Sequence, residues 1–376
     1  MEQEPETPGR DRQWVEIGRA AATAIRTTHP PADAPWSRTQ LLEIFAELRS
    51  TGYLGSTIPK KDGGAGLGIG QFASLTEGLA TMAPFLSNHS VQRYIAAGGS
   101  PQAREEILPA LLEGTSIGAV AVTEPQGGSS LKNLLTRVAP RGKSLVLTGR
   151  KDWVTHAMTA DTAIVLAAGE QGRSVRVLVD LSAAGVLRVP LRAHGLGHLT
   201  FGSLQFSEVE IEPWRILDED GGAGAKAGFS VARVLVAVQA VALAFQALTK
   251  TAQHLATRTA RGARVIDLDV TAQRVGALTA ELYGARLLAY HAVEAVEAGH
   301  QAAAALASGA KAHACTVAVR ACSELVSMCA GHGLDVTTGM AAFRDDAEML
   351  GTADGTGLVN SVLWGAYVKS QLAGPR

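Results

Sequence analysis

The run Thr-Glu-Pro-Gln-Gly-Gly-Ser at residues 123–129 has the composition of a loop that binds a ligand through its backbone. It follows residues 119–122, whose composition predicts a β-strand. A strand that ends in a glycine-rich loop exposes backbone N–H groups, and Thr123 and Ser129 add hydroxyls. Such a loop can bind anionic oxygens or the edge of a heterocycle. The alternative is an ordinary turn with local Ser and Thr hydrogen bonds.

A second run, Lys-Asp-Trp-Val-Thr at residues 151–155, places an aromatic ring beside a short β-branched segment. Trp153 in such a position can stack on a flat ring system, and Thr155 adds a hydroxyl. The alternative is a tryptophan on the inner face of a sheet, since this side chain buries a large area. The two threonines, Thr123 and Thr155, lie 32 residues apart in the same β-rich region.

A third candidate is the acidic residue Asp354, which precedes Gly355 and Thr356. A carboxylate in a dry pocket has a raised pKa and becomes a better general base near neutral pH. The alternative is a solvated turn aspartate before a glycine, which is a common arrangement. Metal chemistry is not expected, because His194 and His198 have no cysteine or acid at ligand spacing.

The elements that position these residues fall into three regions. The first, up to residue 113, has helical periodicity with breaks, and helices are expected near residues 41–48, 71–82 and 102–112. Short β-prone runs then occupy residues 119–122, 144–148, 162–167, 175–179 and 203–211. Long apolar helical segments follow at residues 229–258, 270–299 and 302–329. The prediction is an α+β protein with domains at 1–115 (helical), 116–220 (β-sandwich or barrel) and 221–376 (helical bundle).

Composition excludes several classes of protein. Of the 376 residues, 47% are hydrophobic and 18% are charged, which argues against disorder, and the net charge of -1 gives no basic field for nucleic acid. The apolar run at residues 229–248 is interrupted by Arg233 and Gln239, so a bundle helix is expected rather than a membrane span.

The three cysteines, Cys315, Cys322 and Cys329, recur every seven residues, as small hydrophobic groups on one helix face do. No disulfide framework is expected. The N-terminal residues lack the features of a signal peptide, so the sequence predicts a cytoplasmic protein.

Taken together and in order, these motifs resemble the acyl-CoA dehydrogenase family. That family has a T-E-P-x-x-G-S loop, a K-x-W-[IV]-T motif, and R-D-A followed by E-G-T; here Asp346 and Asp354 keep the spacing of the last two. The family's other motifs, L-P-x-L-x-x-G, F-x-x-V-x-V-P and G-G-x-G, are matched at residues 108–114, 206–213 and 331–333. The resemblance implies a helical N-terminal domain, a central β-domain and a C-terminal four-helix bundle.

The resemblance also implies that the protein binds FAD. It assigns flavin contacts to Thr123, Trp153 and Thr155, and a pyrophosphate contact to Ser129. In the family the arginine of R-x-x-F-G, here Arg258, reaches the FAD of a neighbouring subunit. The cofactor-binding residues carried over are Val122, Thr123, Ser129, Trp153, Thr155, Arg258, Gly331 and Thr356, and those expected to contact the substrate are Ser129 and Gly355.

By the same resemblance, Asp354 is the base that removes the α-proton of an acyl thioester while hydride leaves Cβ for flavin N5. Several positions depart from the family pattern. Asp354 stands where Glu is usual and Ala353 where Tyr is usual, Arg261 replaces Phe, and residues 234–238 offer no alternative acid. The shorter base and the smaller neighbour point to a substrate other than a plain fatty acyl-CoA.

The resulting hypothesis is an FAD-dependent α,β-dehydrogenase of an acyl thioester carried by CoA or by an acyl carrier protein. Its expected electron acceptor is a flavoprotein or O₂, and a homodimer or homotetramer is expected. Oxidation of a 2-hydroxyacyl thioester in the same pocket stays open. So does a flavin monooxygenase on the same fold, which would not need the base, or a non-enzymatic binding relative.

Overall fold

The computed structural model describes residues 6–30, 34–83, 86–128, 133–170, 173–217 and 223–373. Its N-terminal part is helical. Asp11 caps the first helix by accepting a hydrogen bond from the backbone N–H of Gln13, and Ser37 begins the second with a capping box. The helices are α1 (Arg12–Thr28), α2 (Arg38–Arg49), α3 (Ile69–Leu79), α4 (Ser87–Gly98), α5 (Pro101–Glu106) and α6 (Leu108–Glu113). Short 3₁₀ helices η1 (Lys60–Asp62) and η2 (Ala80–Met82) lie between them.

Two features of this part differ from the sequence prediction. The single helix expected at residues 102–112 is two helices, because Pro109 in the first turn of α6 cannot donate the backbone hydrogen bond that would continue α5. Helix α4 was not singled out. It packs against the first strand, where Asn88 Oδ1 accepts a hydrogen bond from the N–H of Gly118 at 2.8 Å.

The central region is an eight-stranded sheet in the order β6-β7-β3-β2-β4-β5-β8, with β1 paired to β4. Most neighbours are antiparallel, but β1 and β2 each run parallel to β4. The strands are β1 (Gly118–Ala121), β2 (Arg137–Arg141), β3 (Ser144–Thr155), β4 (Thr162–Ala168), β5 (Ser174–Asp180), β6 (Val186–Leu191), β7 (Phe201–Ile211) and β8 (Ile216–Leu217). The 3₁₀ helix η4 (Pro213–Arg215) precedes β8.

Strand β3 is longer than expected. The sequence predicted a strand that stops near residue 148, but β3 continues through Gly149 to Thr155 and pairs with β7 over this length. Gly149 has φ +146°, and a Cβ there would lie 2.5 Å from Thr136 Cα, so only glycine permits this close approach. The run at residues 151–155 therefore lies on the C-terminal part of β3, where the register with β7 shifts between Lys151 and Val154.

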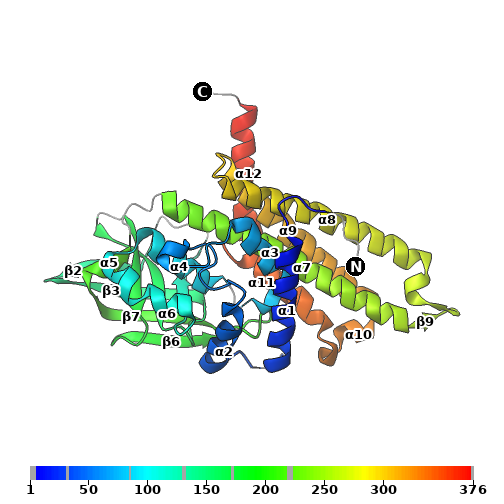
Figure 1. Cartoon of the computed structure of the whole chain (residues 1–376), viewed down its shortest axis with the longest axis horizontal. Coiled ribbons are helices and arrows are strands. Elements are labelled where there is room, and N and C mark those ends of the chain that lie inside the picture. Colours follow the sequence, from blue (N-terminus) through cyan, green and yellow to red (C-terminus); the bar gives the residue numbers. More distant parts are fainter. Residues whose placement is uncertain are drawn as a thin grey trace.

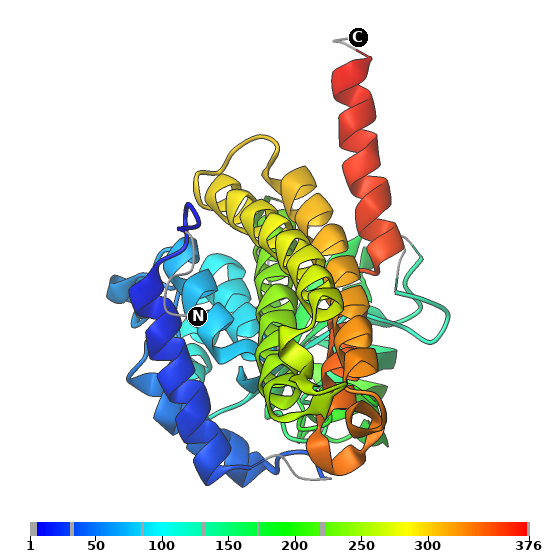
Figure 2. The same ribbon diagram turned by 90° about the vertical axis from the view of Figure 1, so that its right-hand side faces the viewer.

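The C-terminal region is a helical bundle that extends away from the sheet (Figure 1). Helices α7 (Ala223–Thr257), α8 (Asp269–Glu297) and α9 (Ala303–Met328) pack on one another, and α11 (Met340–Thr352) packs against α7 and α9. The remaining elements are β9 (Thr259–Ala260), β10 (Ala263–Arg264), η5 (Val265–Asp267), α10 (Gly331–Leu334), η6 (Val336–Thr338) and α12 (Gly357–Leu372). Helix α12 projects from the body of the molecule (Figure 2).

The apolar character of the bundle helices reflects burial. Gly228–Thr257 is long and apolar enough to cross a membrane, but 83% of its most apolar window is buried inside the structure, as in a core helix. Cys315, Cys322 and Cys329 are buried free thiols, as their spacing predicted. Burial raises the pKa of Cys315 to about 11 and that of Cys322 to about 12, so both remain protonated and unreactive.

The sheet is joined to the bundle by Asp346 of α11. Its Oδ1 accepts a hydrogen bond of 2.6 Å from the N–H of Leu196, in the loop between β6 and β7. Gly195 in the same loop lies so close to α11 that a Cβ would fall 2.0 Å from the carbonyl oxygen of Asp345. Burial raises the pKa of Asp346 to about 6, Asp345 adds to this rise, and the Leu196 hydrogen bond opposes it.

This raised pKa predicts a pH-dependent stability. An aspartate in the unfolded chain titrates near pH ~4, so the folded state binds the proton more tightly and stability falls as pH rises between about 4 and about 6. Asp346→Asn removes this titration and keeps an oxygen acceptor for Leu196. We expect the melting temperature of the variant minus that of the wild type to increase as pH rises from about 4.5 to about 7.5. Asp62→Asn, at an exposed position, is the control. If the melting temperature of Asp346→Asn minus that of the wild type falls or stays constant as pH rises, the pKa of Asp346 is not raised in the folded state.

Candidate active site

The two β-region motifs lie side by side. The N–H of Asp152 donates to the carbonyl of Thr123 at 2.9 Å. The ammonium group of Lys151 donates to the carbonyl of Val122 at 2.9 Å and to Glu124 Oε1 at 2.8 Å. Since Lys151 is fully buried and Glu124 almost so, this pair forms an internal tie between the loop after β1 and strand β3. Glu124 and Lys151 were not assigned a role from the sequence.

Glu124 is held in its ionised form. Burial alone would raise its pKa, but hydrogen bonds from Lys151 and from the backbone N–H groups of Leu135 and Thr136 outweigh burial and lower the pKa to about 2. A buried carboxylate with this many donors fixes the backbone around it. The acid thus shapes the loop that begins at Thr123.

Trp153 is presented to solvent rather than buried. It is 52% exposed and has φ +56°, an unusual conformation for a large side chain. The register between β3 and β7 shifts between Lys151 and Val154, and such a bulge turns a side chain away from its regular position. The interpretation of Trp153 as a core residue is therefore wrong, and its indole offers a flat face at the surface of the β-domain.

The neighbouring candidates are placed as follows. Thr155, the last residue of β3, is mostly buried. Gly128 folds back over Thr123, and a Cβ there would lie 2.9 Å from Thr123 Oγ1. Ser129 lies outside the described residues. An exposed indole next to a loop fixed from beneath fits a flat, phosphate-bearing cofactor such as FAD.

Asp354 lies in the linker between α11 and α12, where three elements of the fold meet. Its side chain is half-buried, and the charges that act on it come from Lys311 of α9 and Arg233 of α7. Tyr94 of α4 is close enough that the Asp354 charge raises its pKa. Because α4 also packs on β1, one helix contacts both the strand that leads to Thr123 and the surroundings of Asp354. Asp354 is therefore a half-buried turn residue rather than a fully solvated one.

The electrostatics of Asp354 suit a base. Burial raises the pKa of its carboxyl group, and the charges of Lys311 and Arg233 oppose that rise. The residue has φ +49°, and Gly355 after it has φ +96°, so two successive residues adopt left-handed conformations. Such strain in a non-glycine residue persists only when the surroundings impose it. Ala353, before it, has only a methyl group and packs against the apolar core.

Gly355 and Thr356 also have visible structural roles. The carbonyl of Gly355 accepts hydrogen bonds from Lys311 and from Asn360. Thr356 is the N-cap of α12, and its hydroxyl accepts a hydrogen bond from the N–H of Val359 at 3.4 Å. These contacts explain their place in the fold and leave their cofactor and substrate roles as predictions.

Arg258 and Gly331 are not near the β-domain of their own chain. Arg258 directly precedes β9, and Gly331 begins α10, at the end of the bundle opposite the sheet (Figure 1). Arg258 is exposed. Arg261 and Gly262 have φ +53° and +80° and form the turn of the β9–β10 hairpin, so Arg261 has a turn conformation at the position where the family has Phe.

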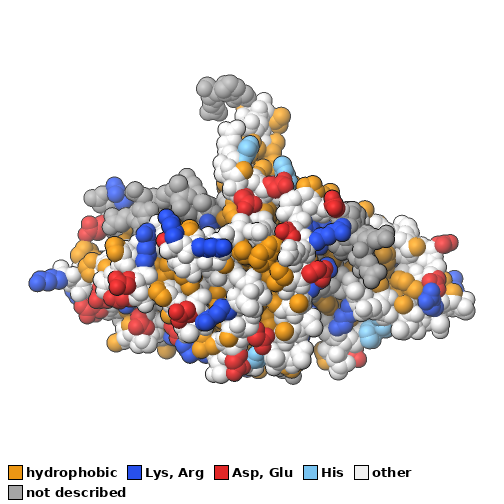
Figure 3. Space-filling model, in the orientation of Figure 1, with side chains coloured by type: hydrophobic (Ala, Val, Ile, Leu, Met, Phe, Trp, Pro, Cys, Tyr) orange, Lys and Arg blue, Asp and Glu red, His pale blue; other side chains and the backbone are white. Residues whose placement is uncertain are grey.

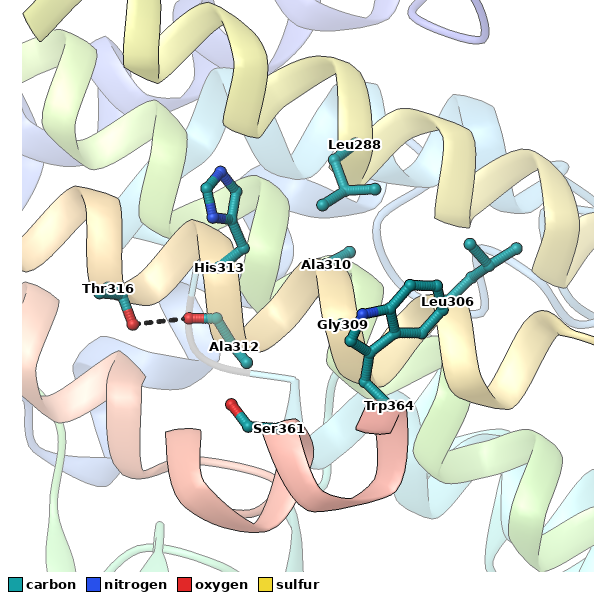
Figure 4. Close-up of a pocket in the computed structure, with 9 residues that line it drawn as sticks. All are labelled: Leu288, Leu306, Gly309, Ala310, Ala312, His313, Thr316, Ser361 and Trp364. Atoms are coloured by element: carbon teal, nitrogen blue, oxygen red, sulfur yellow. Dashed lines mark hydrogen bonds between the residues drawn. The ribbon is translucent and has the colours of Figure 1, made fainter. Parts of the chain in front are cut away.

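One pocket in the described part of the chain lies elsewhere. A hollow of about 380 Å³ lies between α8, α9 and α12, and none of the candidate residues lines it. Figure 4 shows Trp364 of α12 beside Gly309, and the polar residues that line the hollow include His313, Thr316 and Ser361. The hydroxyl of Thr316 is already used, since it donates to the carbonyl of Ala312 at 2.8 Å. This hollow is therefore not the candidate active site.

Comparison with known proteins follows the same division of the chain. Three models of the acyl-CoA dehydrogenase family match in order: the N-terminal domain over residues 16–115, the middle domain over residues 119–209, and the C-terminal domain over residues 219–361. The chain belongs to the acyl-CoA dehydrogenase family. The expected fold, with a helical N-terminal part, a central sheet and a C-terminal helical bundle, is thereby confirmed.

Curated relatives span most of the chain. Cyclohex-1-ene-1-carbonyl-CoA dehydrogenase from Geobacter metallireducens is 27% identical over 336 residues, covering 86% of this chain and 88% of its own. Among solved structures, butyryl-CoA dehydrogenase from Megasphaera elsdenii has a TM-score of 0.88 and 22% identity, covering 98% and 100% of the two chains. The prolyl acyl carrier protein oxidase AnaB has a TM-score of 0.85 and 20% identity, covering 96% and 100%.

This acyl-CoA dehydrogenase family member is an FAD-dependent oxidoreductase of acyl thioesters. The predicted cofactor and enzyme class are confirmed, and a purely binding function is not supported. The surroundings of Trp153 and Thr123 fit FAD on physical grounds as well, as described above. The acyl group, its carrier and the roles of individual residues belong to the proposal below.

The Lys151–Glu124 pair yields a test of the loop's construction. Lys151→Met leaves an ionised carboxylate buried without its cation, and we expect the free energy of unfolding to fall by about 3–5 kcal/mol. The double variant Lys151→Met/Glu124→Gln should lose less than the sum of the two single variants, since no unpaired charge remains. Denaturant unfolding of the FAD-loaded protein measures all four forms. Additive effects, or a loss below about 0.5 kcal/mol for Lys151→Met, would show that the pair does not hold the loop.

Proposed function

We propose that this protein catalyses α,β-dehydrogenation of an acyl thioester, with Asp354 as the base that takes the α-proton. The observation that carries the proposal is the position of Asp354: a half-buried carboxylate whose pKa is raised by burial, in the linker that joins α11 to α12. A raised pKa makes the carboxylate a stronger base while Lys311 and Arg233 keep it ionised. This environment supports a dehydrogenase more than a monooxygenase, which would need no such group.

In this proposal, individual residues bind the cofactor, bind the substrate or accept the proton. Bound FAD supplies the acceptor for the hydride that leaves Cβ. Trp153 offers its exposed indole to one face of the ring system, and Thr155 and the loop beginning at Thr123 orient its polar edge. Val122, Ser129 and Thr356 complete the proposed cofactor contacts, and Ser129 and Gly355 those to the substrate. Asp354 then receives the α-proton on a carboxylate oxygen.

The proposed substrate carries a polar or branched acyl group rather than a plain fatty chain. Asp354 reaches about an ångström less than the usual Glu, and a shift of that size costs on the order of 10²-fold in rate unless the substrate compensates. Ala353 leaves room beside it, and Tyr94 and Arg233 make its surroundings polar. The carrier is CoA, as in the relatives' names, or an acyl carrier protein, as the name of AnaB indicates for that protein.

The proposed electron acceptor is an electron-transferring flavoprotein or O₂. One relative, 25% identical over 85% of this chain, is the CarC subunit of the caffeyl-CoA reductase–Etf complex of Acetobacterium woodii, which associates a similar chain with such a flavoprotein. We place the protein in the cytoplasm, where its buried free thiols would remain reduced.

We also propose a homodimer or homotetramer in which Arg258 and Gly331 contact the FAD of a neighbouring copy. Within one chain they lie at the far end of the bundle from Trp153, so one protomer cannot bring them to its own flavin (Figure 1). Hydrophobic side chains are exposed on the projecting helix α12 (Figure 3), among them Leu358 at 75% and Val362 at 61%. An apolar helix face of this kind favours association between copies.

Anaerobic reduction of the flavin by a thioester tests the proposal that Asp354 is the base. Purified holoenzyme should show flavin absorption bands that one class of acyl thioester bleaches without oxygen, because reduction of FAD accompanies removal of the α-proton. Asp354→Asn should keep the bands and lose at least about 10²-fold in bleaching rate, whereas Asp354→Glu should retain activity. Asp62→Asn, at an exposed site, is the matched control.

The bleaching experiment has two contrary outcomes. Bleaching that survives in Asp354→Asn would assign the base to another residue. Flavin bands that no CoA or carrier-bound thioester bleaches, together with hydroxylation of a substrate supported by NADH and O₂, would favour the monooxygenase.

Variants of Arg258 and of helix α12 test the proposed oligomer and its shared FAD site. Arg258→Met should weaken FAD binding about tenfold or more, by removing a cation from a phosphate contact, and leave the oligomer mass unchanged. The double change Leu358→Glu/Val362→Glu on α12 should instead reduce the mass. Multi-angle light scattering and FAD titration by fluorescence measure both quantities. A monomeric wild-type protein that binds FAD tightly would overturn the shared site.

A further inference from the structure

The linker that carries Asp354 is held through its backbone carbonyl groups. Lys311 Nζ donates to the carbonyl of Gly351 at 2.6 Å and to that of Gly355 at 2.7 Å. Arg233 Nε donates to the carbonyl of Asp354 itself at 3.3 Å. Asn360 Nδ2 donates to the carbonyls of Gly355 and Thr356 at 2.8 and 3.2 Å. Side chains from α7, α9 and α12 thus converge on the linker.

Lys311 is an unusual residue for its position. It is 0% exposed in the middle of α9, and within the described parts of the chain it forms no ion pair with a carboxylate. Burial lowers its pKa, while the charge of Asp354 is among those that raise it. A buried ammonium group without a directly bonded carboxylate is costly, and an alkyl side chain would fill the same space more cheaply. The two hydrogen bonds that Lys311 donates to carbonyl groups therefore indicate a role for its ammonium group beyond filling space.

The two carbonyls lie on either side of Asp354. Gly351 belongs to the last turn of α11, where carbonyl groups have no partner within the helix, and a cation there is also favoured by the helix dipole. Gly355 lies one residue beyond Asp354. A single ammonium group therefore fixes the distance between the end of the helix and the residue after the base. Within that span, Asp354 has φ +49°, a left-handed conformation that costs a non-glycine residue free energy.

The groups that face the base come from each element around it. Arg233 on α7 is held by Ser308 Oγ of α9 at 3.2 Å, and Lys311 projects from α9 itself. Tyr94 reaches the site from α4, with Arg176 of β5 over its ring at 4.9 Å. Of the two cations that act on Asp354, Lys311 has the larger effect. It therefore contributes both geometry and charge.

We propose that Lys311 is a positioning residue for the base: its buried ammonium group clamps the carbonyls of Gly351 and Gly355 and thereby orients the Asp354 carboxylate and keeps it ionised. This inference deepens the proposed function and rests on it. Lys311 does not exchange a proton with the substrate. It acts through the linker and through its charge, so removing it should alter both the rate and the pH dependence of flavin reduction.

The test compares Lys311→Met, Lys311→Gln and Lys311→Arg with the wild-type holoenzyme, and Lys61→Met at an exposed position of η1 serves as the matched control. Lys311→Met should retain FAD and lose about 10- to 100-fold in the rate of anaerobic flavin bleaching by the thioester. Its bleaching rate should rise with pH through a higher apparent pKa than in the wild type, because a positive charge that favours the ionised base is gone. Lys311→Arg should keep the wild-type pKa.

A second measurement does not depend on activity. Hydrogen exchange of the backbone amides at residues 353–356 should be faster in Lys311→Met holoenzyme, because the linker has lost its clamp. If Lys311→Met fails to fold, Lys311→Gln supplies the same comparison, since it keeps an N–H donor without the charge.

The outcomes separate this inference from the proposed function. A wild-type protein bleached by a thioester, with Lys311→Met and Lys311→Gln equal to it in rate, pH profile and exchange, overturns the positioning role and leaves the dehydrogenase standing. A wild-type protein that no thioester bleaches overturns the proposed function. In that case the exchange data alone decide whether the clamp exists, and unchanged exchange refutes it.

Discussion

Two buried ammonium groups, those of Lys151 and Lys311, hold the two ends of the candidate active site. Lys151 ties the carbonyl after β1 to Glu124, and Lys311 ties the carbonyls on either side of Asp354. Both lysines are fully buried. Removing an ammonium group from water is costly, and hydrogen bonds offset that cost: Lys151 donates to one carbonyl and one carboxylate, and Lys311 donates to two carbonyls. The loop beginning at Thr123 and the linker at Asp354 are both irregular backbone, and a buried cation contributes to fixing each of them.

These two loops belong to different parts of the chain, and helix α4 and the loop at Gly195 connect them. Helix α4 packs on β1 through Asn88 and reaches the surroundings of Asp354 through Tyr94. On the other side, Asp346 of α11 accepts the N–H of Leu196 from the β-domain. The same helix α11 ends at Thr352, two residues before Asp354, the proposed base. A displacement of the sheet relative to the bundle would therefore move the loop at Thr123 relative to Asp354, and the hydrogen bond between Asp346 and Leu196 opposes such a displacement.

The sequence predicted the order of helical, β and helical regions, because periodicity and β-propensity are properties of neighbouring residues. It missed β2, which is largely exposed, and β6, which is mostly half-buried; they contain Pro140 and Pro190, so that they resemble loops. From the residues alone, Trp153 could either stack on a flat ring system or lie in the core, because a bulge depends on pairing with β7 and leaves no local signal. The pairing of Glu124 with Lys151 joins residues 27 apart, and its only sequence signal is that both lie within motifs already singled out.

Arg233 and Lys311 are two further residues whose contacts could not be predicted from the sequence. In the sequence, Arg233 interrupts an apolar helix and Lys311 lies between alanines, so both appear to be flaws in a core pattern. In the structure they converge on one linker from two helices, and the apolar pattern around them is what removes water from their contacts. A shorter base demands more exact placement than a longer one, since it has fewer rotatable bonds with which to reach the substrate. Asp354 in place of Glu is thus consistent with a linker whose carbonyls accept hydrogen bonds on both sides of this proposed base. A shorter side chain can reach the substrate only if the backbone holds it close enough.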